Sequence, residues 1–202
     1  MKKLNFRYLV LSVIFLSIHL LSFSQSQFNL YDSASKLVVS GTSTVHDWEI
    51  DVEHFKCDAT MSLNEKQAIS ISGINFSCPV ENIKSHNRIM DNKTFDALKG
   101  DKFPEIKFSS SELLSIPTSV ADAKIKGKLT IAGKTNDATL QFKAVSENQN
   151  RINVKGETHL KLSDYNIDPP TAMMGALKTG DEITITYNVV LQKTEDNNLS
   201  EK

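Results

Sequence analysis

The sequence predicts an all-β protein, an antiparallel barrel or sandwich of at least eight strands with one short helix. Apolar and polar residues alternate over several segments, which is the period of a half-buried strand. Short polar or glycine-containing turns separate these segments, as in hairpins. Only residues 91–100 have helical spacing. The 202 residues, 40% of them hydrophobic, suffice for one core and are short for two.

The first 24 residues have the pattern of a secretory signal peptide. Basic residues at positions 2, 3 and 7 precede an apolar run over residues 8–21, and the small residues Ser22 and Ser24 follow. An uncleaved membrane anchor is the alternative, but the run is shorter than the roughly 20 apolar residues that span a bilayer. We therefore expect cleavage near Gln25 and an exported protein, either periplasmic or secreted.

The charge balance argues against a nucleic-acid-binding protein. Lys plus Arg number 23 and Asp plus Glu number 24, whereas a nucleic-acid-binding protein usually has an excess of basic residues. No segment after residue 24 is long and apolar enough to span a bilayer. We expect one domain over residues 25–193, and a disordered tail over 194–202, where apolar periodicity is absent.

The predicted strands are clearest in the second half of the chain. Alternation predicts strands over residues 124–131, 137–145, 151–160 and 182–192, with a glycine-containing hairpin link at 132–136. In the first half, strands are expected over 37–42, 48–61, 68–80 and 105–114. The alternation slips near His54-Phe55 and at Ser72-Gly73, and each slip indicates a β-bulge.

Two stretches interrupt the strand pattern. Residues 91–100 predict a short helix, with Asp91 or Asn92 as the N-cap and Gly100 as the C-cap. Pro104 prevents the helix from continuing. Residues 165–180, which include two consecutive prolines, are expected to form a long connection.

Several short elements, in this order along the chain, resemble the YceI-like proteins. They are Gly41–Trp48, the Phe-Pro-x-Ile-x-Phe element 103–108, the Gly-x-Leu-Thr-Ile-x-Gly hairpin within 126–135, and Gly180–Ile185. The resemblance covers roughly residues 28–192. It implies a lipocalin-like fold, an extended eight-stranded antiparallel β-barrel around an apolar tunnel. Members of the family bind polyisoprenoids or other long-chain amphipathic lipids.

The inward apolar residues of the predicted strands are the candidate ligand contacts. The interior of an eight-stranded barrel is either filled by side chains or holds one small ligand. Inward Gly127, Ala144, Gly156 and Thr158 are small and leave lumen volume; alternatively, they fit the taper of the barrel or a tight bend. Eleven residues are predicted to line the lumen: Ile50, Val52, Phe108, Leu129, Ile131, Leu140, Phe142, Val154, Ile185, Tyr187 and Val189.

Four further residues are candidates for a barrel mouth. His46 and Trp48 are expected at a polar strand end with an aromatic plug. Met173 and Met174 form either a flexible apolar lid over the mouth or a loop packed on the barrel end. His46 and His54 share a strand face but stand about 26 Å apart at roughly 3.3 Å per residue, so one metal ion cannot bridge them. No metal site is predicted.

Cys57 and Cys78 lie on consecutive predicted strands of a chain that we expect to be exported. If the turn between the strands is centred near residues 65–66, the two cysteines lie opposite one another or a few residues off, within reach of a disulfide. Two buried free thiols that act as small hydrophobic groups are the alternative. We predict the Cys57–Cys78 disulfide.

The sequence predicts a binding protein without catalytic residues. It contains no Gly-x-Ser-x-Gly, no His-Glu-x-x-His and no glycine-rich phosphate loop. A hydrolase is therefore the less favoured alternative, and a filled barrel that binds another protein through its loops is the main one. No cofactor is expected other than a bound isoprenoid or lipid, and the pattern does not define the oligomeric state.

Overall fold

The computed structural model describes residues 25–63, 68–117 and 122–194. The predicted signal peptide, and all of the predicted tail except Thr194, lie outside the described residues. The helices in the described part are short, and none of them is long and apolar enough to cross a membrane.

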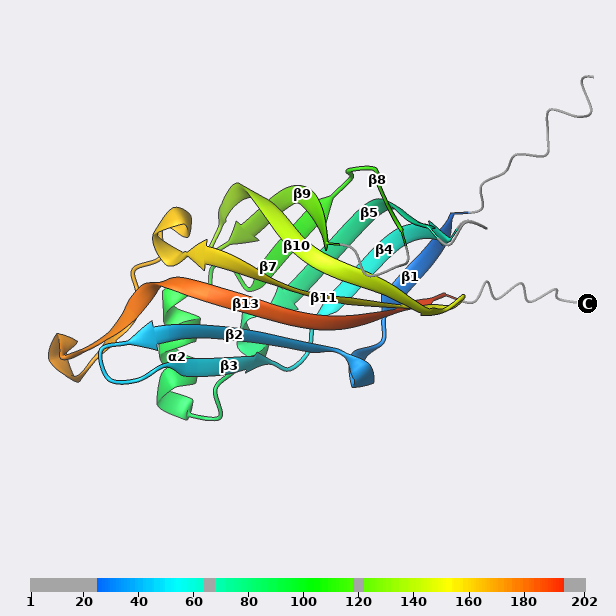
Figure 1. Cartoon of the computed structure of the whole chain (residues 1–202). Helices are drawn as coiled ribbons and strands as arrows, with labels where there is room; N and C mark the ends of the chain where they lie inside the picture. Colours follow the sequence, from blue (N-terminus) through cyan, green and yellow to red (C-terminus); the bar gives the residue numbers. More distant parts are fainter. Residues whose placement is uncertain (1–24, 64–67, 118–121, 195–202) are drawn as a thin grey trace, which may run out of the picture.

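Eight antiparallel strands close into a barrel, which confirms the predicted fold class (Figure 1). Around the barrel, each strand pairs with the next, and the last pairs with the first to close the wall. In this order they are β1 (Ser26–Leu30), β4 (Lys56–Leu63), β5 (Ala68–Pro79), β7 (Glu105–Ser110), β9 (Asp122–Ile131), β10 (Lys134–Asn148), β11 (Arg151–Lys161) and β13 (Leu177–Lys193).

Shorter strands extend the wall at one end. β2 (Lys36–Ser43) pairs with β13 on the same edge as β1, and β3 (Trp48–Val52) and β6 (Ile83–Lys84) follow outward from it. β8 (Leu114–Pro117) pairs with β5, and β12 (Thr171–Ala172) pairs with the start of β13. Single turns of 3-10 helix connect strands: η2 (Asp32–Ala34), η3 (Val80–Asn82), η4 (Leu162–Tyr165) and η5 (Met173–Gly175).

Helix α2 (Arg88–Ala97) begins earlier than the sequence predicts. Its N-cap is Asn87, whose Oδ1 accepts hydrogen bonds from the backbone amides of Ile89 and Met90 at 3.0 and 3.2 Å. Asp91, the predicted cap, instead accepts from the amide and hydroxyl of Ser85 at 2.7 and 2.6 Å. These bonds tie the first turn of the helix to the segment that leaves β6.

The end of the helix also differs from the expectation. Leu98 is the C-cap, and the residue after it, Lys99, takes the left-handed conformation with a φ of 56°. Gly100 is required for a different reason, because the ring of Phe95 lies where a Cβ of residue 100 would be. The predicted C-cap at Gly100 is therefore wrong, although glycine is still needed there.

One of the two predicted bulges is present. Thr60 pairs with Gly73 but Met61 pairs with Ile71, so Ser72 is the extra residue of a bulge in β5. At the other slip the strand ends instead: β3 stops at Val52 and β4 begins at Lys56. The link of β9 to β10 is tighter than predicted, since Ala132 and Gly133, with φ of 48° and 80°, form a two-residue turn.

Aromatic rings occupy the space above the two inward glycines of the wall. A Cβ on Gly127 would collide with the ring of Phe108, and a Cβ on Gly156 would collide with the ring and hydroxyl of Tyr187. The free lumen volume expected at these glycines is therefore absent. The glycines instead let a neighbouring strand lay an aromatic side chain flat against the wall.

We predict that Gly156→Ala destabilises the barrel and that Gly73→Ala does not. A Cβ at residue 156 displaces Tyr187 and meets the Gln141 carbonyl, whereas one at residue 73 lies 3.8 Å or more from its neighbours. Urea unfolding should show a loss of about 1–3 kcal/mol for Gly156→Ala, a typical cost of overpacking, and a change within about 0.5 kcal/mol for Gly73→Ala. Equal losses of stability in both variants would contradict the conclusion that Tyr187 needs the space above Gly156.

Candidate functional site

The barrel encloses an apolar cavity of about 540 Å³. Binding sites for small molecules commonly measure about 300–1,000 Å³, so this volume is sufficient for one ligand. Every residue of the predicted lumen set lies on its wall: Ile50, Val52, Phe108, Leu129, Ile131, Leu140, Phe142, Val154, Ile185, Tyr187 and Val189. Alternation placed them on the correct face, and their contact with a ligand stays a prediction.

β4, β5 and α2 supply a part of the wall that the sequence did not predict. Ala59 and Met61 of β4 line the cavity and are 2% exposed, and Ile71 of β5, the pairing partner of Met61, lines it beside them. Alternation within β4 was a usable signal. The interruption between β3 and β4 and the bulge at Ser72 in β5 made it hard to assign which residues of the two strands point inward. Met90 of α2 also lines the cavity, and strand periodicity has no means of identifying a helical contribution.

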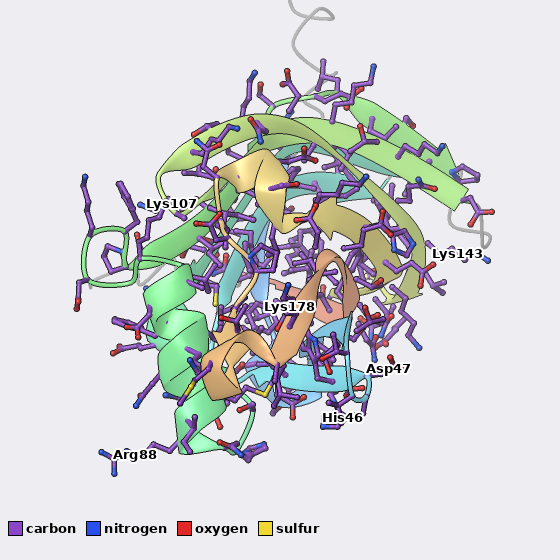
Figure 2. The ribbon with its side chains drawn as sticks, turned by 90° about the vertical axis from the view of Figure 1, so that its left-hand side faces the viewer. His46, Asp47, Arg88, Lys107, Lys143 and Lys178 are labelled. Atoms are coloured by element: carbon purple, nitrogen blue, oxygen red, sulfur yellow. The ribbon has the colours of Figure 1, made fainter. Side chains whose placement is uncertain are left out.

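The cavity reaches the protein surface at one end, which we call the mouth. Its rim is formed by the loop 44–47, the start of α2 and the start of β13, and Figure 2 looks onto this end of the barrel. Val45 and Ile89 line the cavity and are nevertheless 64% and 71% exposed. Lys178 lies on the same rim. An apolar molecule therefore has an apolar route between the surface and the lumen.

Of the four predicted mouth residues, His46 lies at the rim, Trp48 lies on the cavity wall and Met174 lies away from the cavity. His46 lies on the exposed loop at the rim, with its ring Nδ1 2.7 Å from the Asp47 carbonyl oxygen. Trp48 lines the cavity, packs on Gly41 and donates from Nε1 to the Thr42 carbonyl at 2.9 Å. Met174 is fully exposed and does not line the cavity, so it neither covers the mouth nor packs on the barrel. The side chain of Met173 lies outside the described part of the structure.

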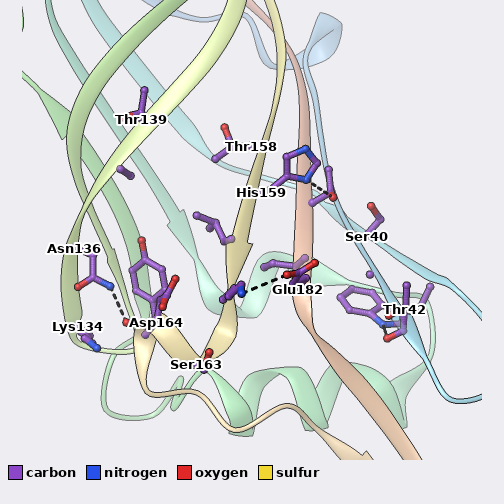
Figure 3. Close-up of a pocket in the computed structure, with 18 of the residues that line it drawn as sticks. Ser40, Thr42, Lys134, Asn136, Thr139, Thr158, His159, Ser163, Asp164 and Glu182 are labelled. Carbon is purple, nitrogen blue, oxygen red and sulfur yellow. Dashed lines mark hydrogen bonds and ion pairs between the residues drawn. The ribbon is translucent and has the colours of Figure 1, made fainter.

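The barrel wall opens where β10 and β11 separate. Their pairing ends at Gln141 and Glu157, and beyond this point each strand pairs only with its other neighbour. A polar cleft of about 1,240 Å³ occupies the outer surface there and extends between the two strands (Figure 3). Thr158, Trp48 and Ile183 line both this cleft and the apolar cavity, so the two spaces meet at these residues.

Helix η4 covers part of the opening. The Asn136 side chain on β10 donates to the Asp164 carbonyl of η4 at 2.7 Å. The amide and hydroxyl of Ser163 donate to the Asp181 carboxylate on the β13 side at 2.8 and 2.6 Å. These two bonds lower the pKa of Asp181, because they stabilise its charged form. The η4 turn is therefore held to both sides of the cleft.

Tyr187 links three strands at the point where the wall opens. From β13 its ring crosses the inner face of β11 above Gly156, and its hydroxyl donates to the Gln141 carbonyl of β10 at 2.7 Å. Burial of the ring raises the pKa of Tyr187, so the hydroxyl stays protonated and keeps donating at neutral pH. This bond fixes the last pair of β10 and β11.

The structure contradicts the predicted Cys57–Cys78 disulfide, since both thiols are free. Cys57 pairs with Phe76, which places Cys78 diagonally, two residues further along β5. Diagonal neighbours are about 7–8 Å apart, beyond the usual disulfide span. Both cysteines line the apolar cavity instead.

We predict that both thiols are present and slow to react in the folded protein. Burial raises the pKa of Cys57 and of Cys78 to about 12, so at pH 8 on the order of one thiol in 10⁴ is the reactive thiolate. Labelling of the native protein should speed up about tenfold per pH unit as the pH rises toward 12. Denaturation without reductant should then expose two rapidly labelled thiols. If no thiol is labelled after denaturation, the two cysteines form a disulfide.

The described residues show no cluster of metal-ligating side chains. Across residues 25–63, 68–117 and 122–194, no group of three or more His, Cys, Asp or Glu side chains is arranged to hold a metal ion. His159, on the outer wall, pairs through Nδ1 with the Thr184 hydroxyl at 3.0 Å. The arrangement of the barrel is suited to burying an apolar chain.

The sequence of this barrel matches the family model of the YceI-like domain over residues 24–191. The chain belongs to the YceI-like domain family. No curated protein sequence matches it significantly.

Solved structures of low sequence identity share this fold. The chain is similar to BcnA of Burkholderia cenocepacia, with 17% identity and a TM-score of 0.63 over 80% of this chain and 98% of that one. A polyisoprenoid-binding domain from Saccharophagus degradans has 11% identity and a TM-score of 0.60 over 85% and 100% of the two chains. The YceI protein of Campylobacter jejuni has 18% identity and a TM-score of 0.56, over 72% and 85%.

Proposed function

We propose that this YceI-like protein is an exported binding protein that holds a polyisoprenoid or other long-chain amphipathic lipid inside its barrel. The observation that carries the proposal is the apolar cavity of about 540 Å³, which opens through a mouth with exposed Val45 and Ile89. The Saccharophagus domain of the same fold is described as polyisoprenoid-binding, which supports this ligand class. Export rests on the N-terminal pattern of residues 1–24.

The two alternatives are less well supported. A barrel that acts only through its loops needs no internal space, and the cavity speaks against such a filled interior. A hydrolase needs a nucleophile, a base and an oxyanion hole in one place. Among the described residues, the apolar wall brings no such set together. Its two thiols, of Cys57 and Cys78, and its phenol, of Tyr187, have pKa values raised by burial. Binding without catalysis is therefore the proposed activity.

We predict that Leu129→Arg abolishes lipid binding and that Gln141→Arg does not. Leu129 is 6% exposed and lines the cavity, so an arginine there leaves an unpaired charge beside the apolar chain and fills lumen volume. Gln141 is exposed on the outer wall opposite Glu157, where a new arginine meets water and an acidic neighbour. Lipid extracted from each purified variant is quantified by mass spectrometry.

Circular dichroism must first establish that both variants are folded. If Leu129→Arg does not fold, Val154→Phe provides the same test without a charge, because it fills the lumen from a half-buried position on β11. A folded lumen variant that retains as much lipid as the wild type places the ligand elsewhere. Absence of any lipid from the wild-type protein, both as purified and after incubation with isoprenoids, would end the proposal.

A further inference from the structure

Large apolar side chains project into water at the mouth end of the barrel. Among the described residues, three of the four most exposed large apolar side chains lie at this end: Val45, Ile89 and Met174. The fourth, Leu113, lies between β7 and β8 and does not line the cavity. Single exposed apolar residues are ordinary on a protein surface, but a group of them around the opening of an apolar cavity indicates an interaction site.

The segments that carry these side chains are held in place by backbone hydrogen bonds. The amide of Val45 donates to the Ser43 hydroxyl oxygen at 3.3 Å. The amide of Thr44 donates to the Lys178 carbonyl at 3.0 Å, which joins the loop 44–47 to the start of β13. Met174 lies at the tip of the hairpin formed by β12 and the start of β13, drawn in orange at the same end as α2 in Figure 1. The backbone therefore presents these apolar side chains outward.

The charged side chains at the opening are basic. Among the described residues that line the cavity, Lys93 and Lys178 are the only lysines or arginines, and no Asp or Glu lines it. Lys93 lies four residues after Ile89 on α2, so the two share one face of the helix. Figure 2 shows Lys178 near the middle of this end of the barrel. Both lysines are exposed, and neither forms an ion pair with a described residue.

The acidic side chains close to the mouth in sequence lie off this surface. Asp47 follows on the same loop but lines the polar cleft, whose wall has more acidic than basic side chains. Asp91 and Asp96 of α2 are absent from the cavity lining, so they lie off the face that carries Ile89 and Lys93. The two openings therefore differ in charge, and an anionic surface is attracted to the mouth rather than to the cleft.

This combination of apolar and basic groups fits the surface of an anionic bilayer. Apolar side chains enter the boundary between headgroups and acyl chains, while basic side chains contact the anionic headgroups. The lumen opens among these groups, so an apolar chain can pass between bilayer and lumen without crossing water. A protein partner seated on the same surface would instead close this route.

We propose that the mouth docks on an anionic lipid bilayer, with Val45, Ile89 and Met174 in the interface and Lys93 and Lys178 on the headgroups. The inference rests on the proposed lipid-binding function and goes beyond it, because it assigns the surface through which the lumen exchanges its ligand with a membrane.

The test measures how much protein floats with lipid vesicles in a density gradient. The vesicles consist of phosphatidylcholine, either alone or with about 30% phosphatidylglycerol, whose headgroup is anionic. The protein used lacks residues 1–24, because the apolar run 8–21 would bind vesicles by itself. All eight strands of the barrel lie after residue 24. The wild type should bind the anionic vesicles more tightly than the neutral ones, and added salt should weaken this binding.

The apolar contribution is tested with Ile89→Asp and its matched control, Leu113→Asp. Both replace an exposed apolar side chain with the same acidic one, and only the first lies at the mouth. Residue 89 is in the first turn of α2, where an acidic side chain stabilises a helix, so we expect this variant to fold. Ile89→Asp should weaken binding to anionic vesicles about tenfold or more. Leu113→Asp should change it by less than about twofold, because a distant charge is screened.

The basic contribution is tested with the double variant Lys93→Glu/Lys178→Glu. Its control is Lys124→Glu/Lys155→Glu, which makes the same change in net charge at exposed positions of β9 and β11. One basic residue near an anionic surface contributes about fivefold in affinity, so the mouth pair should weaken binding to anionic vesicles at least about 25-fold. The control pair should weaken it by less than about threefold. Circular dichroism establishes that all variants are folded.

Two results would overturn the inference. If the wild type floats with neither kind of vesicle, the mouth does not dock on a bilayer, and a protein becomes the partner to seek. If a mouth variant and its control lose binding equally, the loss reflects net charge and not docking at this end. Failure of the proposed function looks different, because the wild type would then float with anionic vesicles but contain no extractable lipid, even after incubation with isoprenoids.

Discussion

Closure of the barrel depends on the backbone hydrogen bonds along both edges of β13. One edge pairs with β11 from Glu182 to Gln192, and the other pairs with β2 and then with β1. Since both edges are occupied, the barrel has no free edge at its last strand. The inward row from Ile183 to Leu191 lines the cavity along this paired length. The strand that closes the wall therefore also sets the depth of the binding space.

The opening between β10 and β11 follows from the same strand. Tyr187 reaches from β13 across β11 to the Gln141 carbonyl, and this is possible only because residue 156 has no side chain. From Gln141 to Asn148, β10 is paired with β11. Residues 134–140 of β10 pair only with β9, and residues 158–161 of β11 pair only with β13. The Tyr187–Gln141 bond thus lies at the boundary between a continuous wall and a cleft.

Alternation along the chain was sufficient to predict the fold class, most strands of the barrel and the faces of the lumen residues, because side-chain direction in a strand has a period of two. It did not predict β1, and it joined β3 and β4 into one strand. Cross-strand register was not predictable in the same way. Cys57 and Cys78 were expected opposite one another or a few residues off, within reach of a disulfide, but the register pairs Cys57 with Phe76 and leaves Cys78 on a diagonal. Which aromatic ring lies over Gly127 or Gly156 depends on register too, so alternation left open whether these glycines give lumen volume or fit the wall.

The chemical difference between the two openings gives the barrel a direction. At the mouth, exposed Val45 and Ile89 border an apolar lumen, whereas at the cleft Thr158 meets a polar surface with excess acidic groups. A polar group buried against the apolar wall of the lumen would lose its hydration without compensation. An amphipathic molecule avoids this cost when its apolar chain lies in the lumen and its polar end lies at one of the two openings.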